Sequence, residues 1–141
     1  MLDPISATFR IAASGLQAQS TRMRVVAENL ANAESTGSTP GADPYRRKLV
    51  SFDSALDRAS GVSLVAVKRV SADQRPFRMG YDPSHPAADE KGFVKLPNVD
   101  SLVELADMKE ANRSYQASLQ IWRQARELHA MIFSGPASNR Q

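Results

Sequence analysis

The sequence contains no cysteine and few aromatic residues, and these absences remove several classes of function. Without cysteine, a chain of 141 residues can form no disulfide, thiolate metal site or cysteine nucleophile. Aromatic residues make up only 6% of the chain, so a core must be built mainly from aliphatic and alanine side chains. No run of 18 apolar residues is present, so we expect no membrane-spanning segment.

The charge balance and the N-terminal residues argue against a nucleic-acid partner and a cleavable signal peptide. The 18 Lys and Arg residues exceed the 15 Asp and Glu residues by three, and this surplus is scattered, so a nucleic-acid partner is not predicted. Residues 1–10 lack a basic flank followed by an apolar run, so we expect no cleavable signal peptide. A hydrophobic content of 42% suffices for a core, and the length fits one domain or at most two.

A long helix is predicted for residues 1–33. Asp3 can cap it, and Pro4 fits the first helical position, where its missing N–H costs nothing. Gly15 costs about 1 kcal/mol in a helix interior, which suggests that another backbone comes close there. The pattern repeats every 3.5 residues, the spacing of a coiled-coil seam. The seam positions are Ile5, Phe9, Ala12, Leu16, Gln19, Met23, Val26 and Leu30.

A second long helix is predicted for residues 101–135, followed by a tail at 136–141. Ser101 and Glu104 have the spacing of a capping box, and Gly135 with Pro136 forms a stop signal. Its apolar stripe consists of Leu105, Met108, Ala111, Tyr115, Leu119, Trp122, Ala125, Leu128 and Ile132.

The middle segment, residues 34–100, has a different composition. Its first part, 34–44, is small and polar, as in a loop. Four short strand-like runs follow, at 49–52, 62–70, 77–81 and 93–96. The predicted fold is therefore mainly α, with long N- and C-terminal helices packing as a coiled coil and a short irregular or β middle. The pattern leaves open whether this middle folds as a sheet or stays extended.

The helix lengths exceed what a compact domain of this size can enclose. A compact chain of 141 residues has a diameter of roughly 37 Å, whereas a helix of about 30 residues is roughly 45 Å long. Part of the apolar surface must therefore meet other chains, or the ends stay partly unfolded until it does. In the alternative, each helix breaks in two and folds back on itself.

Both ends of the chain carry motifs more specific than their helical pattern. The N-terminal motifs are Ser14–Ala18 (SGLQA), Ala27–Ala33 (AENLANA) and Ser35–Gly37 (STG). The C-terminal motifs are Glu104–Met108 (ELADM) and Ala111–Ala117 (ANRSYQA). Together they resemble the terminal signatures of bacterial flagellar rod and hook proteins.

Three middle motifs are similar to the proximal rod members of that family: Pro44–Lys48 (PYRRK), Tyr81–Asp89 (YDPSHPAAD) and Gly92–Val99 (GFVKLPNV). The resemblance implies a structural subunit of the basal-body proximal rod in the periplasm, exported without a cleaved signal peptide. Its terminal helices would assemble helically and transmit torque. The implied partners are other rod proteins, copies of itself, the membrane ring at the rod base and the export apparatus. No enzyme activity, cofactor, nucleic acid or small-molecule substrate is expected.

The residues predicted to mediate subunit interaction are Leu16, Met23, Val26, Asn29, Leu30, Ala31, Asn32, Leu105, Met108, Tyr115, Gln116, Leu119 and Trp122. Leu16, Met23, Val26 and Leu30 are expected to pack against Tyr115, Leu119, Trp122 and Ile132, within a subunit and between neighbours. Asn29 and Asn32 lie beside the seam. Buried amides there would set the register of the helices, or they would merely weaken and end the first helix.

Two polar motifs invite other functions. His85 lies near Asp82, Ser84 and Asp89, a hydrolase-like or metal-like set, but the flanking prolines favour a structural turn. The run Arg46–Lys48 is expected to be a solvated face or to form salt bridges with a neighbouring subunit. Two further functions stay open as alternatives: a cytoplasmic coiled-coil adaptor or export chaperone of a type III secretion system, and a cell-wall hydrolase.

Overall fold

A computed structural model describes residues 3–58 and 61–134 of the chain. Its elements, in order, are α1 (Pro4–Ala31), β1 (Lys48–Asp57), β2 (Val62–Ala72), β3 (Arg78–Tyr81), β4 (Phe93–Leu96) and α2 (Ser101–Ser134). Both helices run unbroken, so the alternative in which each helix breaks and folds back is wrong. All four predicted strands are present, and they form two separate antiparallel sheets, β1–β2 and β3–β4.

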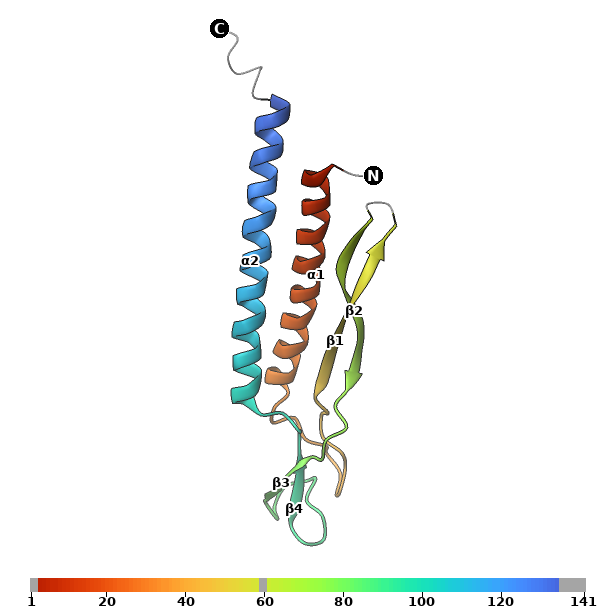
Figure 1. Cartoon of the computed structure of the whole chain (residues 1–141). Helices are drawn as coiled ribbons and strands as arrows, with labels where there is room; N and C mark the ends of the chain where they lie inside the picture. The colour runs from red at the N-terminus through yellow and green to blue at the C-terminus, as the bar shows by residue number, and fades with distance from the viewer. Residues whose placement is uncertain (1–2, 59–60, 135–141) are drawn as a thin grey trace.

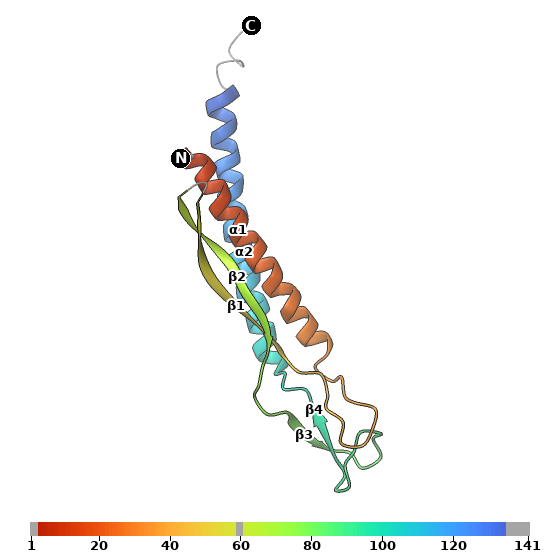
Figure 2. The same cartoon turned by 90° about the vertical axis from the view of Figure 1, so that its right-hand side faces the viewer.

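The molecule is elongated, with three layers along most of its length. α1 lies between α2 on one side and the β1–β2 hairpin on the other, and the β3–β4 sheet lies beyond the end of the helix pair (Figures 1 and 2). The start of α1 and the end of α2 lie at the opposite end from that sheet (Figure 1). Within the described part of the chain, no helix is long and apolar enough to cross a membrane.

The two ends of α1 follow from its capping residues. The Asp3 carboxylate accepts a hydrogen bond from the backbone N–H of Ser6 at 3.0 Å, and Pro4 opens the helix, as predicted. At the other end Asn32 is the C-cap, and its side-chain amide donates to the carbonyl of Glu28 at 2.9 Å. Asn32 therefore ends the helix, which is the simpler of the two roles considered for it.

The predicted capping box of α2 is wrong. Asp100, not Ser101, is the capping residue, because its Oδ1 accepts from the backbone N–H of Leu102 at 3.0 Å. The Glu104 side chain is fully buried and hydrogen-bonds to Arg47 and Asn29 rather than turning back to the cap. The predicted stop at Gly135 and Pro136, and the tail after it, lie outside the described residues.

α1 and α2 run antiparallel and touch along most of their length. The ring of Phe9 meets that of Trp122 edge to face at 5.9 Å, near one end of the pair. Arg22 pairs with Asp107 closer to the other end. Between residues 104 and 125 of α2, the buried and half-buried positions are Glu104, Asp107, Met108, Ala111, Ser114, Tyr115, Ser118, Leu119, Trp122 and Ala125.

Both ends of the predicted α2 stripe stay exposed within one subunit. Leu105, Leu128 and Ile132 are each more than half exposed. Ile132 lies at the end of the pair where α1 begins, so it cannot pack against Leu30 within one chain (Figure 1). Within one subunit the stripe is covered between Met108 and Ala125 and exposed at its ends, where contact with neighbours stays a prediction.

The β1–β2 hairpin covers a face of α1 that the seam pattern did not predict. Ala18 and Val25 are fully buried, although neither is a seam position. Arg10 binds Asp57 of β1 at 2.7 Å, and Ser14 Oγ accepts from the backbone N–H of Val65 at 3.3 Å. α1 therefore buries two faces, one under α2 and one under the hairpin.

Gly15 lies close against Ser118 of α2, as the sequence predicted for this position. A Cβ built on Gly15 would lie 2.7 Å from Oγ of Ser118. We expect Gly15→Leu to lower the free energy of unfolding by about 2 kcal/mol through overpacking, measured by urea denaturation. In the double variant Gly15→Ala with Ser118→Ala the collision is gone, so the better helix propensity of alanine should keep or raise stability. Unchanged stability in Gly15→Leu would contradict the close approach.

Candidate functional site: an apolar helix face and the polar network behind it

The structure divides the predicted interaction residues into two groups. Most are buried or half-buried, chiefly along the helix pair: Leu16, Met23, Val26, Asn29, Leu30, Asn32, Met108, Tyr115, Leu119 and Trp122. Three remain exposed on the surface: Ala31, Leu105 and Gln116. Contact between any of these residues and a neighbouring subunit stays a prediction.

α2 presents an apolar face that the rest of the described chain does not cover. Ile121, Leu128 and Ile132 are 48%, 51% and 58% exposed. They are separated by seven and four residues, so they lie on one side of the helix. The neighbouring Met131 and Phe133 are also exposed. α2 has 34 residues and α1 has 28, so α1 is too short to cover the end of its partner.

The overlong helices were expected to leave part of their apolar surface uncovered within one subunit, and this face is part of it. The predicted stripe did continue to Leu128 and Ile132, but the sequence did not show where α1 would stop covering it. Leu102, Val103 and Leu105 form a second exposed apolar group at the start of α2. Such uncovered apolar groups suit a surface that binds another protein, since large exposed apolar patches usually mark binding sites.

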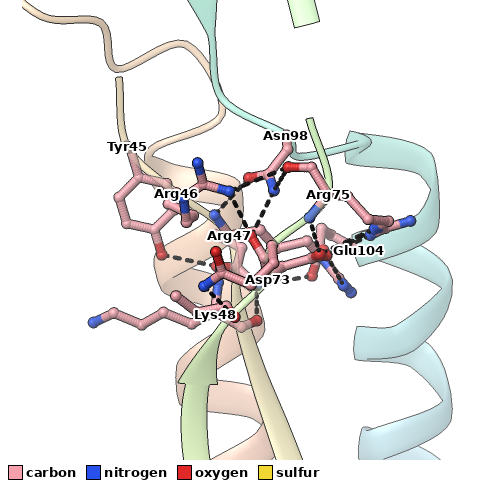
Figure 3. A network of polar contacts seen from close by, with 11 residues as sticks. Tyr45, Arg46, Arg47, Lys48, Asp73, Arg75, Asn98 and Glu104 are labelled. Carbon is pink, nitrogen blue, oxygen red and sulfur yellow. Dashed lines mark hydrogen bonds and ion pairs between the residues drawn. The ribbon is translucent and has the colours of Figure 1, made fainter. Parts of the chain in front are cut away.

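A buried polar network lies where the helix pair meets the β segments (Figure 3). Its centre is Glu104, whose side chain is 0% exposed and which accepts hydrogen bonds from Arg47 Nε and, at 3.3 Å, from Asn29 Nδ2. Asn29 is also buried, and its amide bonds both the N–H and the carbonyl of Lys48 at 2.9 Å. The hydroxyl of Tyr45 donates to Asn29 Oδ1 at 2.7 Å. Asn29 therefore fixes the start of β1 against both helices.

The second half of the network surrounds Asp73, which follows β2. Arg75 donates to its two carboxylate oxygens, with Nη2 at 2.6 Å from Oδ2, and Arg47 Nη1 lies 3.2 Å from the same oxygen. These hydrogen bonds, chiefly those from Arg75, hold the pKa of Asp73 far below its usual value despite burial. Burial lowers the pKa of Arg47, but Glu104 and Asp73 raise it by more, so Arg47 stays charged.

Arg46 and Arg47 of the basic run are engaged within the chain, which corrects the expectation of a solvated face for these two residues, whereas Lys48 is exposed and salt bridges to a neighbouring subunit stay a prediction. Arg46 donates to the carbonyls of Asp73 and Arg75 and stacks over the Phe77 ring at 4.1 Å. Lys48 pairs with Glu28 at 2.9 Å. Sequence analysis missed this role because the acidic partners lie far away in the chain.

Because of this network, the free energy of unfolding should depend on pH. Because the folded pKa of Asp73 is below its unfolded value of about 3.9, its ion pairs stabilise the fold above about pH 4 and are lost as the pH falls further. Replacing Asp73 with Asn should lower the free energy of unfolding by about 2 kcal/mol at pH 7. The difference between variant and wild type should shrink below pH 4 in thermal melts. An equal difference at pH 7 and pH 3 would contradict this assignment.

His85 occupies a structural turn. Its Nδ1 accepts from the backbone N–H of Ala87 at 2.9 Å, and its Nε2 lies 3.2 Å from Oγ1 of Thr36. Ser84 Oγ instead donates to Asp82 at 3.0 Å. The His85 ring therefore links its own loop to the loop that contains Thr36. Over residues 3–58 and 61–134, no group of three potential metal-ligating side chains comes together.

Comparison with known proteins identifies the class of this elongated helix pair. Residues 9–41 match the family described as "Flagella basal body rod protein", and residues 90–132 match "Flagellar basal body rod FlgEFG protein C-terminal". These two segments contain most of α1 and α2. The class is therefore that of the flagellar basal-body rod proteins.

Individual relatives refine this assignment. The chain is 60% identical to the flagellar basal-body rod protein FlgC of Agrobacterium fabrum over 92% of this chain and 93% of that protein. FlgC of Salmonella typhimurium is 47% identical over 80% and 84% of the two chains, and FlgC of Aquifex aeolicus 39% identical over 94% and 97%. The chain belongs to the FlgC family of flagellar basal-body rod proteins. It is a structural rod protein and not an enzyme, and the adaptor or chaperone alternative is not favoured.

Proposed function

We propose that this chain is built into the proximal rod through its helix pair, with α1 and α2 packing as a coiled coil that neighbouring subunits extend. The burial pattern of α2 supports this packing, because two sets of covered positions recur every seven residues: Glu104, Ala111, Ser118 and Ala125, and Met108, Tyr115 and Trp122. In this proposal residues 1–33 and 101–135 form the rod core, residues 34–100 are the middle segment, and 136–141 are a tail.

The uncovered apolar face of α2 carries the proposal. Burying one such side chain fully contributes about 1.5–3 kcal/mol, so Ile121, Leu128 and Ile132 together offer a substantial contact energy. In this proposal the α2 face of one subunit packs against a different surface of the next subunit, so the contact joins unlike patches. Such contacts do not close into a dimer and can generate a helical tube. The partners proposed are copies of this chain and other rod proteins, with Ala31, Leu105 and Gln116 as further contacts.

The remaining assignments rest on membership of the FlgC family. We place the subunit in the periplasmic rod, where it transmits torque, near the membrane ring at the rod base. It reaches this place through the flagellar export apparatus without a cleaved signal peptide. The absence of cysteine is compatible with passage through a narrow channel, since no crosslink can form there.

Deletion of the gene with complementation tests the proposed function. Cells lacking this chain should be non-motile, and electron microscopy of their basal bodies should show a membrane ring without the rod beyond its base. Complementation with the wild-type chain should restore both. Rods of normal length in the deletion strain would overturn the proposal.

A further inference from the structure

The segment of residues 76–99, which includes β3 and β4, is contacted by the loop 33–43 that follows α1. Neither strand packs against a helix or against the β1–β2 hairpin. Figures 1 and 2 show the β3–β4 sheet beyond the end of the helix pair. The backbone N–H of Gly41 donates to the carbonyl of Ala87 at 3.1 Å, and the ring of His85 makes a second contact with the same loop.

The two hydrogen bonds of the His85 ring require one protonation state. A backbone N–H can only donate, so the bond from Ala87 to Nδ1, at 2.9 Å, requires that Nδ1 carry no proton. The neutral imidazole then carries its proton on Nε2, which lies 3.2 Å from Oγ1 of Thr36 and donates to it. His85 is half-buried and Ala87 is 1% exposed, so water has little access to this N–H as a replacement acceptor.

A proton added to Nδ1 would turn this acceptor into a donor. The new N–H would face the N–H of Ala87, and two donors cannot form a hydrogen bond with each other. A buried N–H that loses its acceptor is costly, so the charged ring must leave its position, and its bond to Thr36 is lost with it. Histidine is the side chain that ordinarily changes charge between about pH 5 and pH 8. The contact between the two loops should therefore weaken as the pH falls through this interval.

None of the described charged groups around His85 binds its ring. Within residues 3–58 and 61–134, no carboxylate forms a hydrogen bond or an ion pair with the imidazole. Among the acidic side chains of the two loops, Glu90 is exposed and four have other partners: Asp82 with Ser84, Asp89 with the N–H groups of Lys91 and Phe93, Asp43 with Lys95, and Glu34 with Arg78. Protonation of the ring therefore gains no ion pair and costs the bond from Ala87.

We propose that His85 is a pH-sensitive latch, which holds the loop 82–89 against the loop 33–43 while its imidazole is neutral and releases it when the imidazole is protonated. The latch lies at the opposite end of the molecule from Leu128 and Ile132, so it is independent of the apolar face proposed for assembly (Figure 1). It also acts at higher pH than the ion pairs of Asp73, which are lost only below about pH 4.

Nuclear magnetic resonance of the full chain labelled with nitrogen-15 tests the latch without any substitution. At about pH 8, long-range proton–nitrogen spectra should show the His85 ring protonated on Nε2 and not on Nδ1. Towards about pH 5, the amide resonances of Thr36 and Ala87 should shift with the same midpoint as the ring. The hydrogen-exchange protection of the Ala87 amide should fall about fivefold, as expected for the loss of one hydrogen bond. A proton on Nδ1 at the higher pH, or unchanged protection of Ala87, would overturn the proposal.

His85→Asn separates the hydrogen bond from the titration. The side-chain carbonyl of Asn can accept from the N–H two residues later, as in an Asx turn, but it does not gain a proton in this range. Protection of the Ala87 amide in this variant should change less than about twofold over the same pH range. A fall as large as in the wild type would contradict the latch. If His85→Asn does not fold, the protonated nitrogen and the shared midpoint in the wild type decide the question.

The other histidine provides the matched control. His129 lies on α2, where its ring contacts Phe9 and Phe133 and is far from the loop 82–89 (Figure 1). His129→Gln should therefore leave the pH response of Ala87 as it is in the wild type. Loss of the response in His129→Gln would assign the pH dependence to the helix pair and overturn the proposal.

Discussion

Replacing Ile121, Leu128 and Ile132 with glutamate should abolish incorporation into basal bodies and motility while the isolated chain stays folded. The three side chains are about half exposed, so a glutamate at each position can keep its carboxylate in water in the isolated chain, whereas a neighbour packed on this face would bury it. Losing half of the burial energy of each side chain weakens a contact by about 3 kcal/mol, or roughly 100-fold in affinity. Motility in soft agar and the amount of this chain in purified basal bodies measure the effect.

A matched control uses the polar side of the same helix. Lys109, Gln120 and Arg123 are exposed, and their replacement by glutamate also adds three carboxylates to α2. This control should retain more motility than the apolar-face variant, and both purified chains should melt close to wild type. Equal loss of motility in the two variants would mean that acidic charge, rather than the apolar face, causes the defect. Normal motility in the apolar-face variant would remove this face from the assembly.

Replacing Glu104 with alanine should cause a large loss of stability. The carboxylate is fully buried, and its removal leaves the charge of Arg47 without its partner on α2 and takes away one of the two acceptors of Asn29 Nδ2. Breaking a buried ion pair in this way costs about 4 kcal/mol, a large share of the stability of a domain this size. Urea denaturation followed by circular dichroism at 222 nm measures it.

Glu110 provides the comparison for this substitution. It lies on the same helix and pairs with Arg22 at 3.4 Å, but its side chain is 70% exposed. Glu110→Ala should therefore leave the urea midpoint nearly unchanged, because exposed ion pairs contribute little. If Glu104→Ala and Glu110→Ala shift the midpoint equally, the buried network does not stabilise the fold as described.

Sequence reasoning predicted the elements of this chain well because their signals are local. Asp3 and Pro4 mark the start of α1 within a few residues, and the apolar run at 93–96 coincides with β4. The misassigned capping box shows the limit of local signals. Ser101 and Glu104 have the correct spacing, yet Asp100 makes the better cap, and Glu104 is drawn into the network by Arg47, which lies 57 residues earlier.

The candidate site was harder to predict because it depends on which faces stay uncovered. Leu128 and Met108 look equivalent in the apolar stripe, but α1 covers one and not the other. The burial of Val25 beneath the hairpin likewise depends on strands that pair far along the chain. The motifs nevertheless predicted the family correctly, because they extend over both helices and the loops between them.

The reactivity of a cysteine placed at Leu128 tests the assembly surface most directly. Leu128→Cys would be the only thiol in the chain, and Leu128 is 51% exposed in the isolated subunit. Maleimide should label this variant rapidly as a purified monomer and at least tenfold more slowly in intact basal bodies from motile cells. Equal labelling rates in the two states would show that this face of α2 remains open in the rod, contrary to the proposed assembly.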